Sequence, residues 1–250
     1  SWIGVPQEEI ERINLESMRH RSMEGILADR NQMWNLLSAV SEFNETNLPP
    51  NIETITAEQF PDEWQYIQRR QVPGDYPVLV QEPHKNRPHV IIPFTHDGQI
   101  VGHTTRFLDD HKPKYISETP ADYVFGWDLQ RPSWQHVLVM EGVFDALSIG
   151  GMAVLHADIS DGQARLIRSL GRDVTVVPDR DLAGMRLVER ALDLGWAVSI
   201  PDWEWGIKDV NDAVARYGRL GTLLSIMHSR ETSRIKIELR RKNFVAKLRN

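Results

Sequence analysis

Acidic residues follow three short apolar segments of this sequence, at positions where their carboxylates could act together. The apolar segments are 137–140, 174–177 and 197–200. The acidic residues after them are Glu141, Asp145, Asp179, Asp181, Asp209 and Asp212. Like charges that converge repel one another unless a cation lies between them. Mg²⁺ and similar ions take oxygen ligands, usually one or two carboxylates with waters and substrate phosphates. The pattern therefore predicts a divalent metal site that handles phosphate groups.

The spacing of these acids limits how they can be arranged. Asp179 and Asp181 are two residues apart, so in an extended segment they point the same way and Arg180 points the other way. Glu141 and Asp145 are four apart and share a face only if a helix begins early. Asp209 could instead cap the helix that follows it. We expect the group to act jointly as a catalytic and metal-binding set.

Alternating strands and helices must position these carboxylates. We predict strands at 137–140, 153–156, 174–177 and 197–200. Helices are expected at 143–150, 160–170, 182–194 and from about 211 to 217, with Ser160 and Gln163 as a capping box. This alternation is typical of an α/β fold with a parallel sheet flanked by helices. The carboxyl ends of such strands form the ligand crevice.

Upstream of the sheet lies a predicted β-hairpin that carries basic residues. Segments 90–94 and 99–105 flank Asp97 and Gly98, a strong turn signal. Arg106 ends the second strand, and Lys112 and Lys114 follow. Basic groups beside an acidic crevice suggest phosphate binding. Surface charge around a hairpin is the alternative.

The two ends of the chain give weaker signals. Residues 1–70 suggest helices, one starting at Pro6, one with an apolar face over 33–40 and one led by a capping box at 56–59, with a linker at 44–51. Residues 230–250 contain eight Lys and Arg against two Glu. That tail is either a solvated amphipathic helix or a surface for a polyanion or partner.

Composition excludes several classes of protein. The 250 residues carry a net charge of -6, so bulk charge alone does not hold nucleic acid. With no Cys there is neither a disulfide framework nor a thiolate zinc site in this chain, and an intracellular, cytoplasmic setting is expected. No apolar run is long enough to span a bilayer, and we expect no membrane partner. The sequence also lacks the glycine motifs of P-loop and dinucleotide sites.

The motifs EGVFD at 141–145, VPDRDLAG at 177–184 and KDVND at 208–212 resemble the Toprim domain. That domain is shared by bacterial-type DNA primases, topoisomerases, recombination mediators and some nucleases. The segments IPF at 92–94, GQIVG at 98–102 and KPKYISETP at 112–120, with Arg106, resemble the N-terminal half of a bacterial or phage primase core. The resemblance extends over residues 60 to 220.

This resemblance implies a role for each matching residue. Glu141 matches the catalytic glutamate, and Asp179, Asp181 and Asp209 match metal-binding positions, with Asp145 as an accessory acid. Asn211 stands where many primases have aspartate, so Asp212 is a candidate for a second ion. The resemblance implies two or more Mg²⁺ or Mn²⁺ ions. Basic residues expected to bind nucleotide or template are Arg106, Lys112, Lys114 and Lys208.

The primase resemblance also implies an organisation and a function. We expect a helical segment at 1–60, a primase-core lobe at 61–133, a Toprim domain at 134–218 and a basic helical extension at 219–250. The expected activity is nucleotidyl transfer from ribonucleoside triphosphates to make RNA primers on single-stranded DNA. A replicative helicase and a zinc-binding domain supplied elsewhere are expected partners.

The sequence leaves three alternative functions. A Toprim nuclease or topoisomerase-like enzyme would cleave phosphodiesters, and should lack a basic nucleotide-binding lobe. A phosphohydrolase with an Asp-x-Asp motif normally has its nucleophile near the start of the chain. A non-catalytic DNA-binding domain would bind DNA without synthesis that depends on Mg²⁺.

Overall fold

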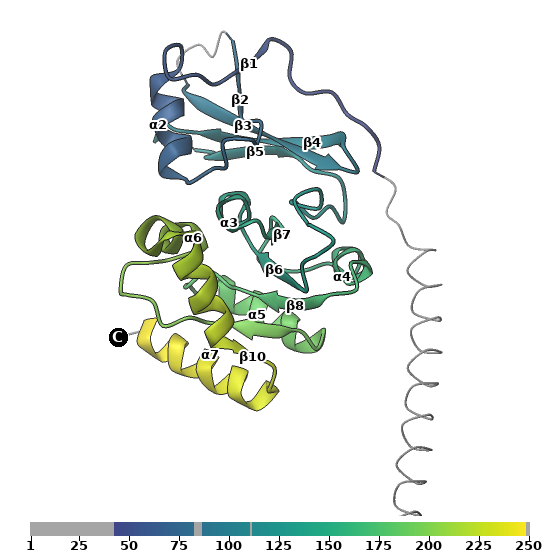
Figure 1. The fold of residues 1–250 in the computed structure, drawn as a ribbon, viewed down its shortest axis with the longest axis vertical. Helices are drawn as coiled ribbons and strands as arrows, with labels where there is room; N and C mark the ends of the chain where they lie inside the picture. The colour runs from purple at the N-terminus through teal and green to yellow at the C-terminus, as the bar shows by residue number, and fades with distance from the viewer. Residues whose placement is uncertain (1–42, 83–86, 111, 249–250) are drawn as a thin grey trace, which may run out of the picture. The chain divides into compact units, whose positions relative to one another are not determined.

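The computed structural model describes residues 43–82, 87–110 and 112–248. These residues form two five-stranded sheets, one antiparallel and one largely parallel (Figure 1). The helices predicted to start at Pro6 and to present an apolar face over 33–40 lie outside the described residues. None of the described helices is both long and apolar enough to cross a membrane.

The first sheet is a meander of neighbouring strands in the order β1-β2-β3-β4-β5. Its strands are β1 (Ile52–Thr54), β2 (Leu79–Gln81), β3 (His89–His96), β4 (Gln99–Phe107) and β5 (Tyr115–Glu118). Helix α2 (Pro61–Arg69) buries Tyr66 and Ile67 in the core shared with β3. Val90, Ile92 and Phe94 are fully buried in that core, and Ile91 is buried as well, so this strand is apolar on both faces.

The predicted hairpin is confirmed. β3 and β4 pair antiparallel, and Asp97 and Gly98 form the turn with φ of 52° and 77°. Both turn N–H groups donate to the carboxylate of Asp128, at 2.9 and 3.1 Å. An Asp-Gly pair suits this turn because both positions need a positive φ.

The capping box expected at 56–59 forms only a turn. Thr56 Oγ1 accepts a hydrogen bond from the N–H of Gln59 at 3.3 Å, but α2 begins five residues after Thr56, at Pro61. Proline lacks an N–H and its φ is already helical, so it favours the first turn of a helix. The predicted helix start was therefore early.

The second sheet has the order β10-β9-β8-β6-β7. Strands β6 (His136–Met140), β7 (Met152–Ala153), β8 (Asp173–Val176) and β9 (Ala197–Ser199) are parallel, as predicted. The helices between them are α3 (Val143–Ile149), α4 (Asp161–Ser169) and α5 (Gly184–Asp193). After β6, the next strand in the chain, β7, pairs on one side of β6. The chain then crosses over, so that β8 pairs on the other side of β6 and β9 pairs with β8. The order therefore reverses at β6, which makes the β6–β8 boundary the switch point where such sheets bind ligands.

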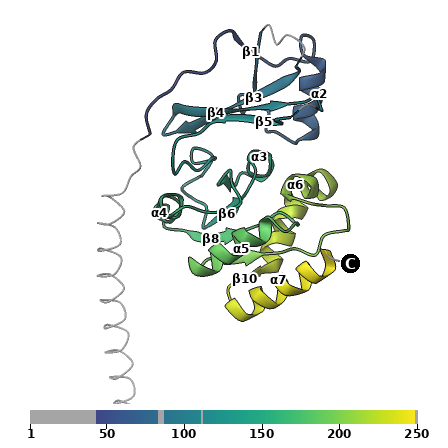
Figure 2. The same ribbon diagram turned by 180° about the vertical axis from the view of Figure 1, so that it is seen from behind.

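Both faces of this sheet are buried, which explains its continuous apolar strands. Leu138 and Met140 of β6 belong to a core with α3 and the start of α6 (Val210–Ser229). Val137 and Val139 belong to a second core with α4, α5 and α7 (Arg234–Leu248). Figure 2 shows the same elements from behind. Alternate side chains of one strand thus hold helices on opposite faces.

Local signals set most of the helix ends. Gly150 ends α3 in the left-handed conformation, with φ of 75°. Ser160 and Gln163 form the predicted capping box at the start of α4. The strand predicted at 153–156 is shorter, however, because Leu155 has φ of 66°, which an extended strand does not allow. β7 therefore ends at Ala153.

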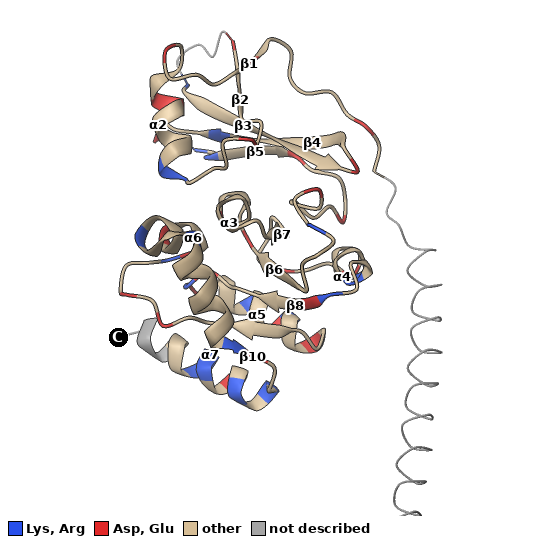
Figure 3. Cartoon of the chain, in the orientation of Figure 1, with Lys and Arg blue, Asp and Glu red and all other residues tan. Residues whose placement is uncertain are grey.

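The chain beyond Gly218 adds to the parallel sheet. The non-helical Gly218 (φ 73°, ψ 162°) interrupts α6 directly after Tyr217, where the predicted helix ends, and a second helical segment then continues to Ser229. β10 (Arg230–Glu231) then pairs antiparallel with β9. Figure 3 shows the concentration of basic residues on α7.

The basic tail is packed on the fold through its own apolar residues. Ile237 and Phe244 of α7 are buried in the second core. Arg241 binds Glu189 of α5, and Arg234 lies 3.6 Å from Asp193 at the end of the same helix. These contacts give part of the basic charge of α7 a structural role.

We expect Ser160→Ala to lower the free energy of unfolding by about 1 kcal/mol, because Ser160 Oγ accepts a hydrogen bond from the N–H of Gln163 at 3.0 Å. Urea denaturation measures the change. Ser169→Ala, at the other end of α4, is the control and should change it by less than half as much. Equal effects would contradict a capping role.

Candidate active site

The end of β6 presents two carboxylates separated by a glycine. Glu141 directly follows the strand and is half-buried, and its Oε2 is buried without a hydrogen-bond partner among the described residues. Gly142 is the N-cap of α3, so Asp145 lies in the first helical turn. A Cβ on residue 142 would lie 2.5 Å from Asp145 Oδ2, so glycine leaves room for the carboxylate of Asp145 beside the backbone. Because α3 begins only at Val143, Glu141 lies outside the helix, and the early helix start on which a common helical face depended is absent.

The end of β8 places Asp179 and Asp181 beside the start of α5. The N–H of Gly184 donates to Asp181 Oδ1 at 2.9 Å, so the side chain of Asp181 satisfies a free N–H of the helix. A Cβ on Gly184 would lie 2.2 Å from the carbonyl oxygen of Asp179. Glycine is therefore needed at this position, and α5 begins there, two residues after the predicted start at residue 182.

The start of α6 brings a third acidic segment to the site. Asp209 is the N-cap, and its Oδ1 accepts from the N–H of Asp212 at 2.7 Å. Asp212 Oδ2 in turn accepts from the N–H of Lys208 at 3.2 Å. Asp209 thus has the capping role that the sequence left open, and its carboxylate also acts on the pKa of Asp145 and Asp179.

Lys208 lies between the two aspartates that follow β8, Asp179 and Asp181. Its Nζ is 3.1 Å from Asp181 Oδ2 and 3.8 Å from Asp179 Oδ2. The carbonyl of Lys208 also accepts from the N–H of Arg180 at 2.7 Å, so the backbones of the two segments are joined. The amine therefore occupies a position between carboxylates that a bound cation would also favour.

Burial and mutual repulsion dominate the electrostatics of the site. Burial, followed by the charges of Asp209 and Glu141, raises the pKa of Asp179 to about 7. Burial also raises the pKa of Glu141 and of Asp209, and raises that of Asp145 well above its usual range. Burial acts to raise the pKa of Asp181. The hydrogen bond from the N–H of Gly184 and the amine of Lys208 outweigh it, so the pKa of Asp181 is lowered. The site has more negative charge than its own cations neutralise.

The donor set fits a hard divalent ion. Glu141 has a buried, unpartnered oxygen, and the other donors are carboxylate oxygens, which Mg²⁺ and Mn²⁺ accept. In the part of the chain that the structure describes, no three His, Asp or Glu side chains already form a complete binding cluster. Mg²⁺ usually needs only one or two carboxylates, with waters and phosphates completing its shell. The acids fit an ion that binds together with its substrate.

Two residues that connect the first sheet to this site were not predicted as functional. Asn211 is buried, and its N–H donates to Asp145 Oδ1 at 2.8 Å. Its side chain contacts Arg70, which follows α2, through Arg70 Nη1 at 3.1 Å and the Arg70 carbonyl at 2.6 Å. The charge of Arg70 acts on Asp145 and Asp209. Arg70 follows an ordinary amphipathic helix, so no local pattern marked it.

The predicted basic residues occupy different environments. Arg106 lies on β4 with its guanidinium 4.6 Å from the ring centre of Tyr115 on β5. Within the described part of the chain, its buried Nε has no hydrogen-bond partner. Burial raises the pKa of Tyr115, on which the charges of Arg106, Arg70 and Asp145 also act. Arg106 and Tyr115 are therefore near the acidic site.

Lys112 and Lys114 lie in the loop before β5. Lys112 is exposed, whereas Lys114 Nζ contacts the carbonyl of Asp109 and lies 3.3 Å from Asp110 Oδ1. In this arrangement the amine of Lys114 is bound within its own loop. A role in phosphate binding stays a prediction for both.

Comparison with known proteins supports the resemblance on which these assignments rest. No family model matches the sequence. Two curated relatives are DNA primases, from Halalkalibacterium halodurans (30% identity over 152 residues, 53% of this chain and 25% of the relative) and Deinococcus radiodurans (32% over 114 residues, 39% and 20%). This chain is therefore similar in sequence to bacterial DNA primases, and it spans about a quarter of the length of these relatives.

A solved structure, the Escherichia coli primase catalytic core, aligns with 84% of this chain and 74% of its own at 19% identity and a TM-score of 0.47. The sequence relatives, and not this alignment, carry the resemblance to primases.

In protein free of metal, we expect Asp179→Asn to raise the free energy of unfolding at pH 8. The pKa of Asp179 is about 7 when folded and about 3.9 when unfolded, so the folded state binds more protons and loses stability as pH rises from 4 to 7. The gain from the substitution should therefore vanish towards pH 4. Urea denaturation in EDTA at several pH values measures this. The exposed Asp75, changed to Asn, is the control; the same pH profile for both variants would contradict the assignment.

Proposed function

We propose that this chain is the catalytic core of a DNA primase, which makes short RNA primers on single-stranded DNA. The observation that carries the proposal is the group of carboxylates at the switch point of the parallel sheet, next to basic residues from the first sheet. Glu141 and Asp179 follow neighbouring strands there, and Asp209 begins α6. Similarity to bacterial primases supports the same reaction.

In the proposed reaction the 3′-oxygen of one nucleotide attacks the α-phosphate of the next, and pyrophosphate leaves. Glu141, Asp179, Asp181 and Asp209 would hold Mg²⁺ or Mn²⁺, with Asp145 and Asp212 as further acids. Such ions stabilise both the attacking and the leaving oxygen in phosphoryl transfer. Catalysis of this kind depends mainly on positioning and charge.

The other side chains of the site would position the polyanions. Lys208 can exchange its contacts with Asp179 and Asp181 for a phosphate of the incoming nucleotide, because its long side chain is more than half exposed. Arg106 can offer a planar fork to a phosphate, whereas Lys112 and Lys114 act as point charges. Arg70 and Asn211 keep Asp145 in place by direct and indirect contacts.

The proposed activity also defines the partners. The substrates are ribonucleoside triphosphates and a single-stranded DNA template. A replicative helicase and a zinc-binding domain from elsewhere are the further partners that we propose. This chain spans only part of the length of its curated relatives. The helicase and the zinc-binding domain are therefore added as separate proteins when their effect on this chain is tested.

A Toprim nuclease or a topoisomerase-like enzyme would use the same acids to break phosphodiesters. Arg106 and Tyr115, on the first sheet near Asp145, favour a polymerase, because a nuclease has no need of a nucleotide-binding lobe. A run-off assay with ribonucleotides on single-stranded DNA separates the two functions. Elongated products support the primase, and shortened DNA supports the nuclease.

We expect Glu141→Gln to lower primer synthesis by at least about 100-fold, since it removes a charge at the reacting centre with little change in shape. The free energy of unfolding in EDTA should not fall, because the substitution removes a buried charge from a repulsive group. Mn²⁺ binding, followed by the electron spin resonance of the free ion, should weaken in the variant.

Glu53→Gln, at an exposed site on β1, is the matched control and should leave both measurements unchanged. If Glu141→Gln keeps activity and Mn²⁺ affinity within a few-fold of the parent, Glu141 has only a structural role.

Arg106→Ala should weaken binding of single-stranded DNA or nucleotide, because it removes a cation whose buried Nε has no partner among the described residues. For single strands, the slope of log affinity against log salt should fall by about 0.7 for each phosphate that the variant no longer binds. A salt titration of oligonucleotide binding measures the slope. Arg165→Ala, on the exposed side of α4, is the control, and an unchanged slope with unchanged nucleotide affinity would make Arg106 an ordinary surface charge.

A further inference from the structure

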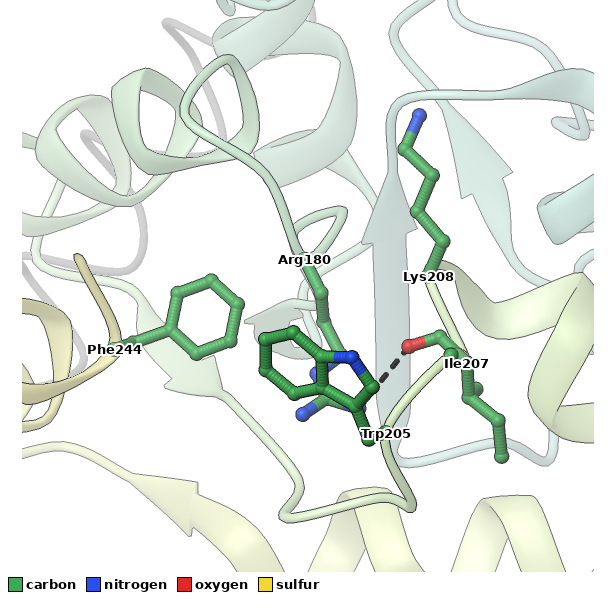
Figure 4. A pocket seen from close by; sticks show the side chains of 6 residues that line it. Arg180, Trp205, Ile207, Lys208 and Phe244 are labelled. Atoms are coloured by element: carbon green, nitrogen blue, oxygen red, sulfur yellow. Dashed lines mark hydrogen bonds between the residues drawn. The ribbon is translucent and has the colours of Figure 1, made fainter. Parts of the chain in front are cut away.

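A pocket with aromatic and cationic walls lies beside the acidic site, at the loop between β9 and α6. Its volume is about 220 Å³. The residues that line it are Arg180, Trp205, Gly206, Ile207, Lys208 and Phe244 (Figure 4). Of these, the proposed reaction uses only Lys208.

Arg180 holds this loop in place. Its Nη1 lies 3.0 Å from each of the carbonyl oxygens of Trp203, Glu204 and Ile207. Its guanidinium also lies over the ring of Phe244 on α7, at 5.6 Å from the ring centre. These contacts are to neutral groups. Arg180 therefore contributes positive charge to the pocket, and the charge of Asp202 acts on it.

Trp205 is the most conspicuous side chain of the pocket because it is 79% exposed. Its neighbour Trp203, in contrast, is buried, and its indole N–H donates to Ser225 Oγ at 2.8 Å. Trp203 thus fixes the loop, whereas Trp205 adds little to the core. The loop is anchored on both sides of Trp205, by Trp203 and by Arg180, so the exposed indole is held on a defined support.

Lys208 links the pocket to the acidic site. Lys208 is one of the residues that line the pocket, and its Nζ contacts Asp181 and Asp179. Figure 4 shows its side chain extending away from the rings of Trp205 and Phe244. A single residue therefore spans the distance between an aromatic wall and the place proposed for phosphate chemistry. A nucleotide has the same two parts, a flat base at one end and phosphates at the other.

We infer that this pocket binds a nucleobase, stacked on Trp205 beside Arg180, while the phosphates of the same nucleotide lie towards Lys208 and the carboxylates. The inference deepens the proposed function and rests on it. The base belongs either to a free nucleoside triphosphate or to a nucleotide of a single strand. Every base has a flat face, so stacking on tryptophan tolerates any sequence.

The test compares ligands with and without a base, in Mg²⁺, for the parent chain and Trp205→Leu. The ligands are ATP, inorganic triphosphate, a single-stranded oligonucleotide and the same oligonucleotide with abasic sites. We expect Trp205→Leu to weaken binding of ATP or of the intact oligonucleotide by about tenfold, and to leave the ligands without bases unchanged. Trp205→Phe, which retains a ring, should recover most of the affinity. Weaker binding of ATP assigns the base to a free nucleotide, and weaker binding of the intact oligonucleotide assigns it to a strand.

Trp64→Leu is the matched control, because Trp64 is an exposed tryptophan on α2. If Trp205→Leu leaves every affinity unchanged, or weakens triphosphate as much as ATP, the base site is wrong while the proposed function stands. If the parent binds neither ATP nor the oligonucleotide and makes no primers, the proposed function and the base site both fall.

Discussion

Repulsion among carboxylates at the edge of a parallel sheet is the interaction on which the site depends. The strand order reverses at β6, so Glu141 and Asp179 emerge from neighbouring strands, and Asp209 joins them at the start of α6. Burial makes this repulsion costly, which is why the pKa of Asp179 rises to about 7. A bound cation such as Mg²⁺ would reduce this repulsion. The same cation would bind the phosphates of the substrate in the proposed reaction.

The surrounding structure keeps these acids close in spite of their repulsion. Gly142 and Gly184 leave room for carboxylate and backbone atoms where a Cβ would collide. Lys208 and the N–H of Gly184 stabilise Asp181 in its charged form. Folding energy from the two buried cores thus compensates for a destabilised site, as is common where function requires strain or charge.

The end of α2 contributes to the site through few but direct contacts. Arg70 and Asn211 bind each other, and Asn211 also holds Asp145. An aspartate at position 211 would add another negative charge beside Asp145. Asparagine avoids that charge and still provides the amide that contacts Arg70 and the carbonyl of Phe144. Asparagine at this position therefore holds Asp145 and Arg70 without adding to the repulsion.

The sequence by itself determined the hairpin, the alternation of strands and helices along the chain, and the carboxylates that follow the strands. These features depend on local signals, such as the turn at Asp97 and Gly98, the capping box at Ser160 and apolar runs of strand length. Only the tertiary structure decided that Arg70 reaches Asn211, that Lys208 lies between two aspartates, and that Arg180 supports the loop of Trp205. Residues 70 and 211 are far apart in the chain, and their contact exists only because two sheets share a core. No periodicity or spacing encodes a contact of that kind.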